Sequence, residues 1–290
     1  MALEKEDRQR RLPAGRKAQL AAYVAETGEV TVTALAERFG VSTETVRRDV
    51  DLLSEQGLVA RAYGGAAAAP MGVQPSFGER NEAHLEERMR IAEHAAALIQ
   101  PGEVLMIDAG STTSQFARRL AVTGRDLTVL TNSLPVATAL GSNERIDVIL
   151  CPGDYSPGET AVYGIETITF LRRFRANSAF IGASGLSADG IMDANRAASA
   201  VKRAMLAQAD TRYLLVDHSK FNQRKLSLVE PLSAIDAVVA DRAPDTMLMD
   251  ALRDAEVTVY AASDTEPITP RLGLTQSSAA SAARHISEET

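Results

Sequence analysis

The sequence predicts a two-domain protein, in which a small helical N-terminal unit precedes a larger α/β domain with a mostly parallel sheet and helices on both faces. The 290 residues exceed one typical domain. From Val104 onward, short apolar segments alternate with helical segments, as in parallel sheets. Residues 66–76 (AAAAPMGVQPS) are small, proline-bearing and uncharged, as in a linker. The expected divisions are 1–65, 66–76, 77–262 and a Ser/Ala/Thr-rich flexible tail, 263–290.

The N-terminal unit shows three helical segments separated by glycines. Arg16–Thr27 carries apolar residues at helical spacing. A second helix is expected after a Thr33 cap, and a third runs from a Ser42 cap to about Gln56. Residues 58–65 (LVARAYGG) then predict two short strands, or a strand and a turn. The glycines that end the helices are Gly28, Gly40 and Gly57.

This order is the layout of a winged helix-turn-helix, in which the third helix enters the DNA major groove. The apolar residues of that helix, Val46, Val50 and Leu53, define its core side. Arg48 then points outward and Arg47 flanks the exposed face, where arginines reach guanine edges or phosphates. The residues expected to contact DNA are Ser42, Thr43, Thr45, Arg47, Arg48, Arg61, Gly64 and Gly65.

The charge balance alone does not reveal a DNA-binding function. The net charge is −7, yet residues 1–65 hold ten basic and ten acidic side chains, so the excess of acid lies in the remainder. Affinity for DNA therefore has to come from where the positive charges sit. As an alternative, the arginine pair forms surface ion pairs with Asp49, Asp51 or Glu44. The turn, the cap and the glycine-ended wing around the pair favour DNA contact.

The α/β domain is predicted from seven apolar strands and the helices between them. The expected strands are Val104–Ile107, Leu127–Leu130, Ile146–Leu150, Ser178–Ile181, Tyr213–Val216, Ala237–Ala240 and Val257–Tyr260. The expected helices are Glu82–Ile99, Thr113–Ala121, Pro135–Leu140, Ile165–Arg173, Ala197–Ala209 and Pro244–Asp254. Because the carboxyl ends of parallel strands meet at one edge, the residues after these strands are expected to lie together.

The residues that follow four of these strands, which we call strand exits, are similarly polar. Residues 107–120 (IDAGSTTSQFARRL) place hydroxyls and backbone N–H groups at a helix start, which suits an anion. Residues 131–137, 181–193 and 214–221 are further polar exits, and Lys220 in the last suits a phosphate. A pentose phosphate, a hexose phosphate and a non-sugar phosphate fit these groups alike. The residues expected to bind an effector are Asp108, Gly110, Ser111, Thr112, Thr113, Asn132, Ser133, Gly153, Gly182, Ser184, Gly185, Asp217 and Lys220.

Simpler roles compete for several of these residues. The acids at 108, 193 and 217 also suit caps of the turns that follow them. Lys202 and Arg203 fit a solvated helix face, and Cys151 fits a packing or loop position. No metal or other cofactor is expected, because the histidines lack ligand spacing. These histidines are His84, His94, His218 and His285.

The motifs of both domains resemble those of the DeoR family of bacterial transcriptional regulators. The N-terminal matches are Val41-Ser42, Thr45-Val46-Arg47-Arg48-Asp49-Val50 and Arg61-Ala62-Tyr63-Gly64-Gly65. The order of TNSLPVA, AFIGASG, VKRAM and LLVDHSKF is similar to the family's sensor domain. This chain departs from the family at Val50, where leucine is usual, and at Pro152-Gly153, where Gly-Gly is common.

The resemblance implies a sensor domain similar in fold to ribose-5-phosphate isomerase and glucosamine-6-phosphate deaminase. It implies a homo-oligomer that binds a double-stranded DNA operator, represses a carbohydrate-metabolism operon and responds to a phosphorylated sugar or related metabolite. The alternative is an isomerase- or deaminase-like enzyme with an appended DNA-binding domain. Such an enzyme needs a carboxylate beside the substrate carbonyl, and residues 183–187 (ASGLS) supply none before Asp189. The sequence therefore favours a sensor that is not an enzyme.

Composition agrees with a cytoplasmic protein. No apolar run approaches the roughly 18 residues needed to span a bilayer. The N-terminus is charged throughout and lacks the apolar core of a secretion signal. A single cysteine forms no internal disulfide, which suits a reducing compartment.

Overall fold

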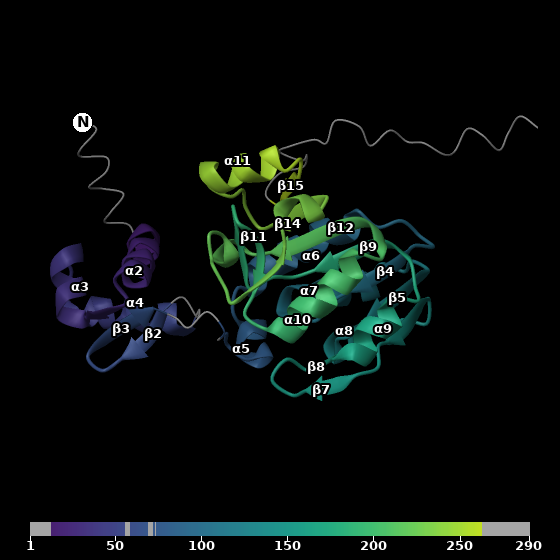
Figure 1. Ribbon diagram of the computed structural model, residues 1–290, viewed down its shortest axis with the longest axis horizontal. Helices are drawn as coiled ribbons and strands as arrows, with labels where there is room; N and C mark the ends of the chain where they lie inside the picture. Colours follow the sequence, from purple (N-terminus) through teal and green to yellow (C-terminus); the bar gives the residue numbers. More distant parts are fainter. Residues whose placement is uncertain (1–12, 56–58, 69–71, 73, 263–290) are drawn as a thin grey trace, which may run out of the picture.

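The computed structural model describes residues 13–55, 59–68, 72 and 74–262 (Figure 1). The expected Gly57 helix stop, part of the expected linker and the expected tail lie outside the described residues. Within the described ranges, each helix falls short of the length and apolar character that a membrane crossing requires.

The N-terminal domain consists of three helices and a three-stranded antiparallel sheet in the order β1-β3-β2. Its elements are α2 (Pro13–Thr27), β1 (Glu29–Thr31), α3 (Val32–Phe39), α4 (Thr43–Glu55), β2 (Val59–Ala62) and β3 (Gly65–Ala68). The three predicted helices and the wing strands are present. Sequence reasoning missed β1, whose three residues show too little alternation to detect. Since β3 extends to Ala68, the wing runs past the expected start of the linker.

The predicted core side of α4 is confirmed, because Val46, Val50 and Leu53 are all buried. Asp49 on the same helix is also buried, and it accepts a 2.7 Å bond from Arg16 Nε of α2. This ion pair fixes α2 against α4. The second helix begins two residues before the predicted position, because Thr31 rather than Thr33 accepts the capping bond, from the Ala34 N–H.

The second domain contains the predicted parallel sheet, with seven strands in the order β15-β14-β12-β9-β4-β5-β6. All its neighbouring pairs are parallel. The strands are β4 (Val104–Ile107), β5 (Leu127–Thr131), β6 (Ile146–Leu150), β9 (Ala176–Ile181), β12 (Ala209–Val216), β14 (Ala237–Ala240) and β15 (Thr258–Ala261). Every predicted strand is therefore present, with boundaries that differ by up to four residues.

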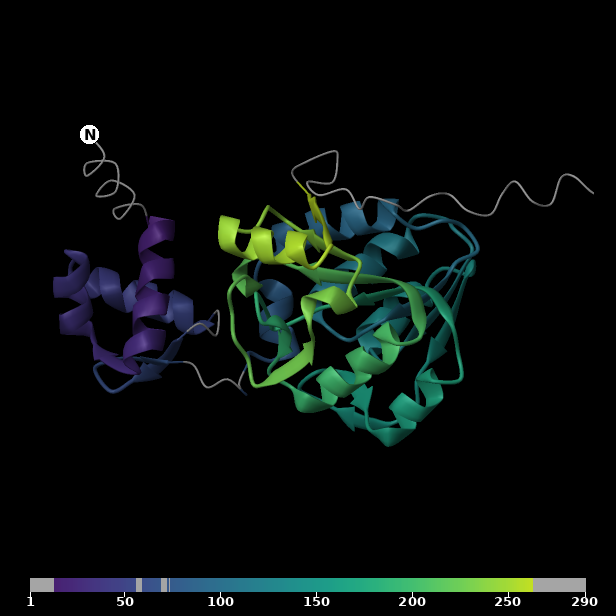
Figure 2. The ribbon, with the colours of Figure 1, turned by 45° about the horizontal axis from the view of Figure 1, so that its top comes forward.

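Helices cover both faces of this sheet, as predicted (Figures 1 and 2). Side chains of α6, α7 and α8 pack into one apolar cluster, and those of α9, α10 and α11 into the other. Successive residues of β4 alternate between the clusters, because strand side chains point to opposite faces. The helices are α5 (Phe77–Glu82), α6 (Leu85–Ala97), α7 (Ser111–Ala121), α8 (Leu134–Leu140), α9 (Ile165–Leu171), α10 (Arg196–Leu206) and α11 (Thr246–Asp254).

The predicted helix Glu82–Ile99 is wrong in one respect, since two helices meet there at a corner. His84 adopts a left-handed backbone, with φ of 52°, between α5 and α6. The buried guanidinium of Arg88 holds the corner by donating to the carbonyls of Arg80 and Ala83. Helical periodicity continues across the corner, so the pattern alone does not show it.

Short elements outside the main sheet were also missed. Two antiparallel groups form, β7 with β8 and β10 with β11 and β13. They are β7 (Asp154–Ser156), β8 (Ala161–Tyr163), β10 (Gly185–Ser187), β11 (Gly190–Asp193) and β13 (Ser227–Glu230). Residues 181–193, read from the sequence as one strand exit, thus form a hairpin that returns Asp193 toward the end of β9.

Candidate functional site

Helix α4 presents its two arginines to solvent. The side chains of Arg47 and Arg48 are 64% and 79% exposed, and they lie 3.9 Å and 3.3 Å from the Glu44 carboxylate. Arg61 on β2 pairs with Asp51 in the same exposed manner. Exposed pairs of this kind contribute about 0–1 kcal/mol, so a DNA phosphate or base edge can replace the acid at small cost. Surface ion pairing is thus present without hiding the arginines.

The start of α4 combines capping with exposed hydroxyls. Ser42 Oγ accepts a 3.2 Å bond from the Thr45 N–H and shares a 2.9 Å bond with the Thr45 hydroxyl. Thr43 is exposed beside them. Helix starts of this kind contact DNA phosphates through hydroxyls and backbone N–H groups.

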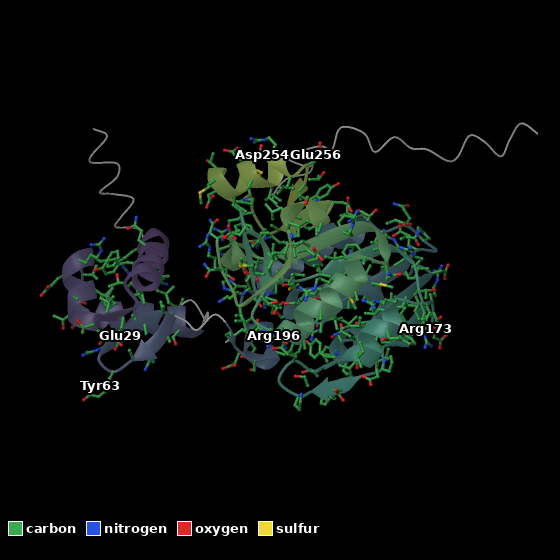
Figure 3. All side chains as sticks on the ribbon, in the orientation of Figure 1. Glu29, Tyr63, Arg173, Arg196, Asp254 and Glu256 are labelled. Carbon is green, nitrogen blue, oxygen red and sulfur yellow. The ribbon has the colours of Figure 1, made fainter. Side chains whose placement is uncertain are left out.

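The two glycines of the wing, Gly64 and Gly65, allow its backbone turn and its close strand packing. Gly64 has φ of +73°, in the left-handed region that favours glycine. Gly65 lies so close to β1 that a Cβ there would collide with the carbonyl of Val30. Both residues therefore have a structural role, whatever they contact on DNA. Tyr63 projects fully exposed from the tip between β2 and β3 (Figure 3).

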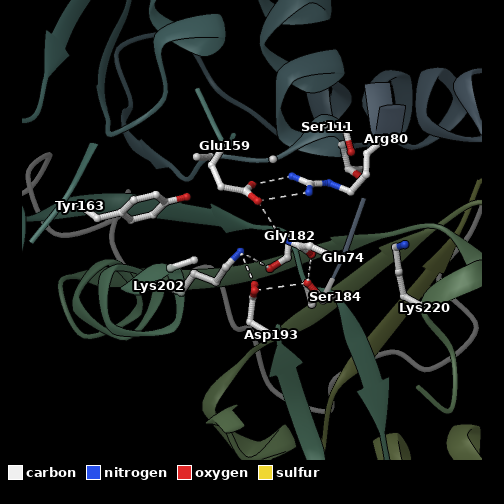
Figure 4. A pocket seen from close by; sticks show the side chains of 15 residues that line it. Gln74, Arg80, Ser111, Glu159, Tyr163, Gly182, Ser184, Asp193, Lys202 and Lys220 are labelled. Atoms are coloured by element: carbon white, nitrogen blue, oxygen red, sulfur yellow. Dashed lines mark hydrogen bonds and ion pairs between the residues drawn. The ribbon is translucent and has the colours of Figure 1, made fainter. Parts of the chain in front are cut away.

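A polar pocket lies at the carboxyl ends of β4 and β9, bordered by the segment after β12 (Figure 4). The residues predicted to bind an effector that line it are Gly110, Ser111, Thr112, Gly182, Ser184 and Lys220. Its other polar lining residues, which the prediction did not include, are Gln74, Arg80, Glu159, Tyr163, Asp193 and Lys202. We call this cavity the polar pocket.

Lys202 on α10 forms one wall of the polar pocket and is buried, so its reading as a solvated residue is wrong. Its ammonium lies 2.5 Å from Asp108 Oδ2 and 3.2 Å from Asp193 Oδ2. It also donates to the Gly182 carbonyl at 2.9 Å. Burial opposes the charge on Lys202, but Asp108 and Asp193 hold its pKa above the usual range. The lysine remains protonated between two carboxylates.

Asp108 lies behind Lys202 and does not cap the turn after β4. Its second oxygen accepts the Gly182 N–H at 3.1 Å. Burial raises the pKa of Asp108 to about 6, although Lys202 opposes the shift. Asp193 accepts the Asn195 N–H at 2.9 Å and the Ser184 hydroxyl at 3.2 Å. The cap reading is thus partly right for Asp193, which also holds Lys202.

The start of α7 forms a second wall. Gly110 at the helix N-cap has extended backbone, and no side chain among the described residues caps the first N–H groups of the helix. The hydroxyls of Thr113 and Ser114 turn back to the Gly110 carbonyl, at 3.1 Å and 2.7 Å. Ser111 and Thr112 line the pocket, while Thr113 does not. The wall therefore offers backbone N–H donors and two hydroxyls to an anion.

Lys220 lies on the side of the pocket opposite Lys202 (Figure 4). Its ammonium has no hydrogen bond or ion pair among residues 13–55, 59–68, 72 and 74–262. Burial lowers the pKa of Lys220, against the attraction of Asp217. Asp217 itself is engaged elsewhere, because the Arg88 guanidinium pairs with it at 3.1 Å and Ser219 bonds to it. A cation without a partner is well placed to receive an anionic ligand.

The other predicted effector residues do not line the polar pocket. Asn132 donates to the Val162 carbonyl at 3.0 Å, and Ser133 Oγ caps α8. Gly153 and Gly185 have no room for a side chain, since a Cβ would collide with Thr167 and Gln223 respectively. These residues shape the strand exits, and we leave them and Asp217 out of the ligand contacts proposed below.

A second ion pair crosses the mouth of the polar pocket. Arg80 of α5 donates to both oxygens of Glu159, at 3.3 Å and 2.6 Å, and the two side chains are only 11% and 15% exposed. Gln74 Nε2 donates to the same carboxylate at 3.0 Å. Sequence reasoning missed all three, because none follows a strand directly.

Cys151 is buried, in agreement with the packing role expected for it.

An exposed arginine-bearing helix beside a wing, and a polar pocket at the edge of a parallel sheet, together define a DNA-binding regulator with a sensor domain. Comparison with known families agrees. Residues 16–70 match the DeoR-like helix-turn-helix domain, and residues 83–242 match the DeoR C terminal sensor domain. The chain therefore belongs to the DeoR family of transcriptional regulators, as its motifs predicted.

Similar proteins include transcriptional repressors. The chain is 33% identical to the glycerol-3-phosphate regulon repressor of Escherichia coli (strain K12), over 81% of this chain and 93% of that protein. It is 32% identical to the HTH-type transcriptional repressor CsqR of the same organism, over 83% and 92%. Among solved structures, ribose 5-phosphate isomerase A of Methanocaldococcus jannaschii is 17% identical, with a TM-score of 0.36 over 48% of this chain and 55% of that chain.

Proposed function

We propose that this regulator represses a carbohydrate-metabolism operon and that a phosphorylated sugar or related phosphate ester in the polar pocket controls its affinity for the operator. One observation carries the proposal: among the described residues, the Lys220 ammonium has no partner. It lies in a pocket that also contains the start of α7. A lysine and free helix N–H groups are the donors that a phosphate takes in proteins.

The opposite end of the polar pocket suits hydroxyl groups. Asp193 and Ser184 line it beside Lys202, and they offer carboxylate and hydroxyl oxygens as acceptors. A ligand with phosphate at one end and hydroxyls at the other matches this division. The name of the glycerol-3-phosphate regulon repressor supports the same class of ligand, a phosphorylated polyol.

The DNA contacts in this proposal come from α4 and the wing. The exposed guanidinium groups of Arg47, Arg48 and Arg61 contact bases or phosphates, with Ser42, Thr43 and Thr45 at the backbone. A homo-oligomer places two such helices on operator half-sites, in the bacterial cytoplasm where the chromosome lies. Effector and operator then alter each other's affinity by the same factor.

Catalysis is the second candidate, because the fold brings Asp193, which the sequence did not place at the site, to the polar pocket near the predicted Asp108. Asp193 lines the polar pocket, and Asp108 lies behind Lys202 with a pKa raised to about 6. Both are engaged with the Lys202 ammonium, so neither is free to accept a proton from a ligand carbon. The ion pairs of these two carboxylates with Lys202 therefore favour ligand sensing over catalysis.

A thermal-shift screen of phosphorylated metabolites against the purified protein tests both candidates. We expect a stabilising ligand that the protein does not convert, and chemical turnover of that ligand would restore the enzyme interpretation. The Lys220→Ala variant should lose the effector response and keep operator affinity. If the folded variant loses both, or loses neither, the separation into a DNA-binding surface and a sensing pocket is contradicted.

A further inference from the structure

Glu159 is an acidic side chain in a pocket where Lys220 and the start of α7 suit an anion. It lies on the turn between β7 and β8, and its carboxylate takes both N–H groups of the Arg80 fork and the Gln74 amide (Figure 4). The neighbouring Pro157 and Gly158 are exposed, so this turn faces solvent while its acid points inward. No feature of the proposed sensor explains why a carboxylate is placed there.

The geometry of Arg80 suits a phosphate as well as a carboxylate. Its planar fork binds either group through two parallel hydrogen bonds. Helix α5, which carries Arg80, is held in place independently of Glu159, because Arg88 donates to the Arg80 carbonyl. Of the cations in the polar pocket, Lys202 is already matched by two carboxylates. Arg80 also donates to the Pro75 carbonyl, but Glu159 is its only acidic partner among the described residues. Arg80 is therefore the cation whose carboxylate partner an incoming anion can replace.

The Glu159 turn also holds the segment that follows the DNA-binding domain. Gln74 bonds to Glu159 through its amide nitrogen and accepts the Ser184 hydroxyl at 2.5 Å through its oxygen. The Phe77 N–H donates to the Gly158 carbonyl at 3.0 Å. Residues 74–77 are thus fastened to the turn by a backbone bond and to its acid by a side-chain bond. A displacement of the turn loosens this segment.

We propose that Glu159 is an internal substitute for the anionic group of the effector. Without effector, it neutralises Arg80 and fastens residues 74–77. An anion bound by Lys220 and the start of α7 takes over Arg80, expels the Glu159 carboxylate and frees the segment that leads to the DNA-binding domain. This inference rests on the proposed function, and it adds Arg80 to the effector site and a route from that site to the DNA-binding domain.

The test uses inorganic phosphate as the probe and the full chain throughout. Glu159→Gln keeps an acceptor for Arg80 but removes the competing charge, so its affinity for phosphate, measured by calorimetric titration, should rise about tenfold. Arg80→Gln should bind phosphate about tenfold more weakly than the unaltered protein. Glu93→Gln is the matched control, because Glu93 pairs with Arg119 on the exposed side of α6 and α7, away from the polar pocket. Circular dichroism checks that each variant is folded.

Hydrogen exchange of residues 74–82 provides the second measurement. Phosphate should speed exchange there in the unaltered protein, and Glu159→Gln should exchange fast without phosphate. If Lys220→Ala binds phosphate as well as the unaltered protein, the proposed effector site itself fails. If Lys220→Ala loses phosphate while Glu159→Gln binds it as the unaltered protein does, only this inference is overturned. Unchanged exchange in phosphate-saturated protein overturns the proposed route to the DNA-binding domain, even if Glu159→Gln does not fold.

Discussion

Replacing Lys202 by methionine removes the only cation, among the described residues, that contacts both Asp108 and Asp193. The Lys202 side chain is 5% exposed, and those of Asp108 and Asp193 are 2% and 5% exposed. Methionine has a similar length and an apolar body, so the substitution changes charge more than volume. The two acids are then left buried without a counter-ion, which is a costly arrangement.

The expected loss of stability is about 3–5 kcal/mol at neutral pH, the range for breaking one partner out of a buried ion pair. At a urea dependence of roughly 2 kcal/mol per molar, this moves the unfolding midpoint by about 2 M. The loss should shrink at acid pH. The pKa of Asp108 is already raised to about 6 by burial, and losing Lys202 raises it further. A folded state with a raised carboxyl pKa binds more protons than the unfolded state, so it regains stability as pH falls toward the ordinary value of 3.8.

Urea titrations followed by circular dichroism, at about pH 8 and about pH 5, measure both effects. The matched control is Arg253→Met, which removes the cation from a pair with Asp250 whose side chains are 58% and 54% exposed. That change should leave the midpoint near the unaltered value at either pH. A Lys202→Met midpoint equal to that of the control, or a loss that grows at acid pH, would refute the reasoning about the buried network.

Three further predictions concern DNA, the wing and the anion. Arg48→Ala should weaken operator binding in a gel-shift titration by roughly 1–3 kcal/mol if Arg48 reads a base, and unchanged binding removes that role. Gly65→Ala should destabilise the N-terminal domain by roughly 1–3 kcal/mol in thermal unfolding, since its Cβ meets the Val30 carbonyl, and a neutral result would contradict that close approach. Affinity for phosphate should fall as pH rises toward the lowered pKa of Lys220, below the usual 10.5, because the ammonium loses its charge there. Lys220→Arg should remove that fall, and an equal decline in both proteins would assign it to another group.

Most of the fold could be predicted from the sequence, because it follows from the spacing of apolar residues within single elements. The spacing of Val46, Val50 and Leu53 set the buried side of α4, and the structure confirms it. Apolar strands of four or five residues identified the parallel sheet in the same way. Three-residue strands such as β1 and β10 are too short for such a pattern to show. The corner at His84 was missed because helical spacing runs through it.

The polar pocket was predicted only in part. Ser111, Thr112 and Lys220 were found because they follow strands directly, and parallel strands bring such positions to one edge. Arg80 and Glu159 were missed because they are 79 residues apart and meet through the turn between β7 and β8. No periodicity or spacing in the chain indicates that contact.

The sequence by itself determined the family, the order of the domains, the exposed arginine-bearing helix α4 and the sheet with its polar edge. Each follows from spacing within one element or from motifs that survive in order along the chain. Only the tertiary structure decided which charges are neutralised and which remain available to a ligand. Lys202 reads as a surface lysine until burial places it against Asp108 and Asp193, whereas Lys220 keeps its charge without a partner among the described residues. Charge pairing depends on distance through space, and distance along the chain does not encode it.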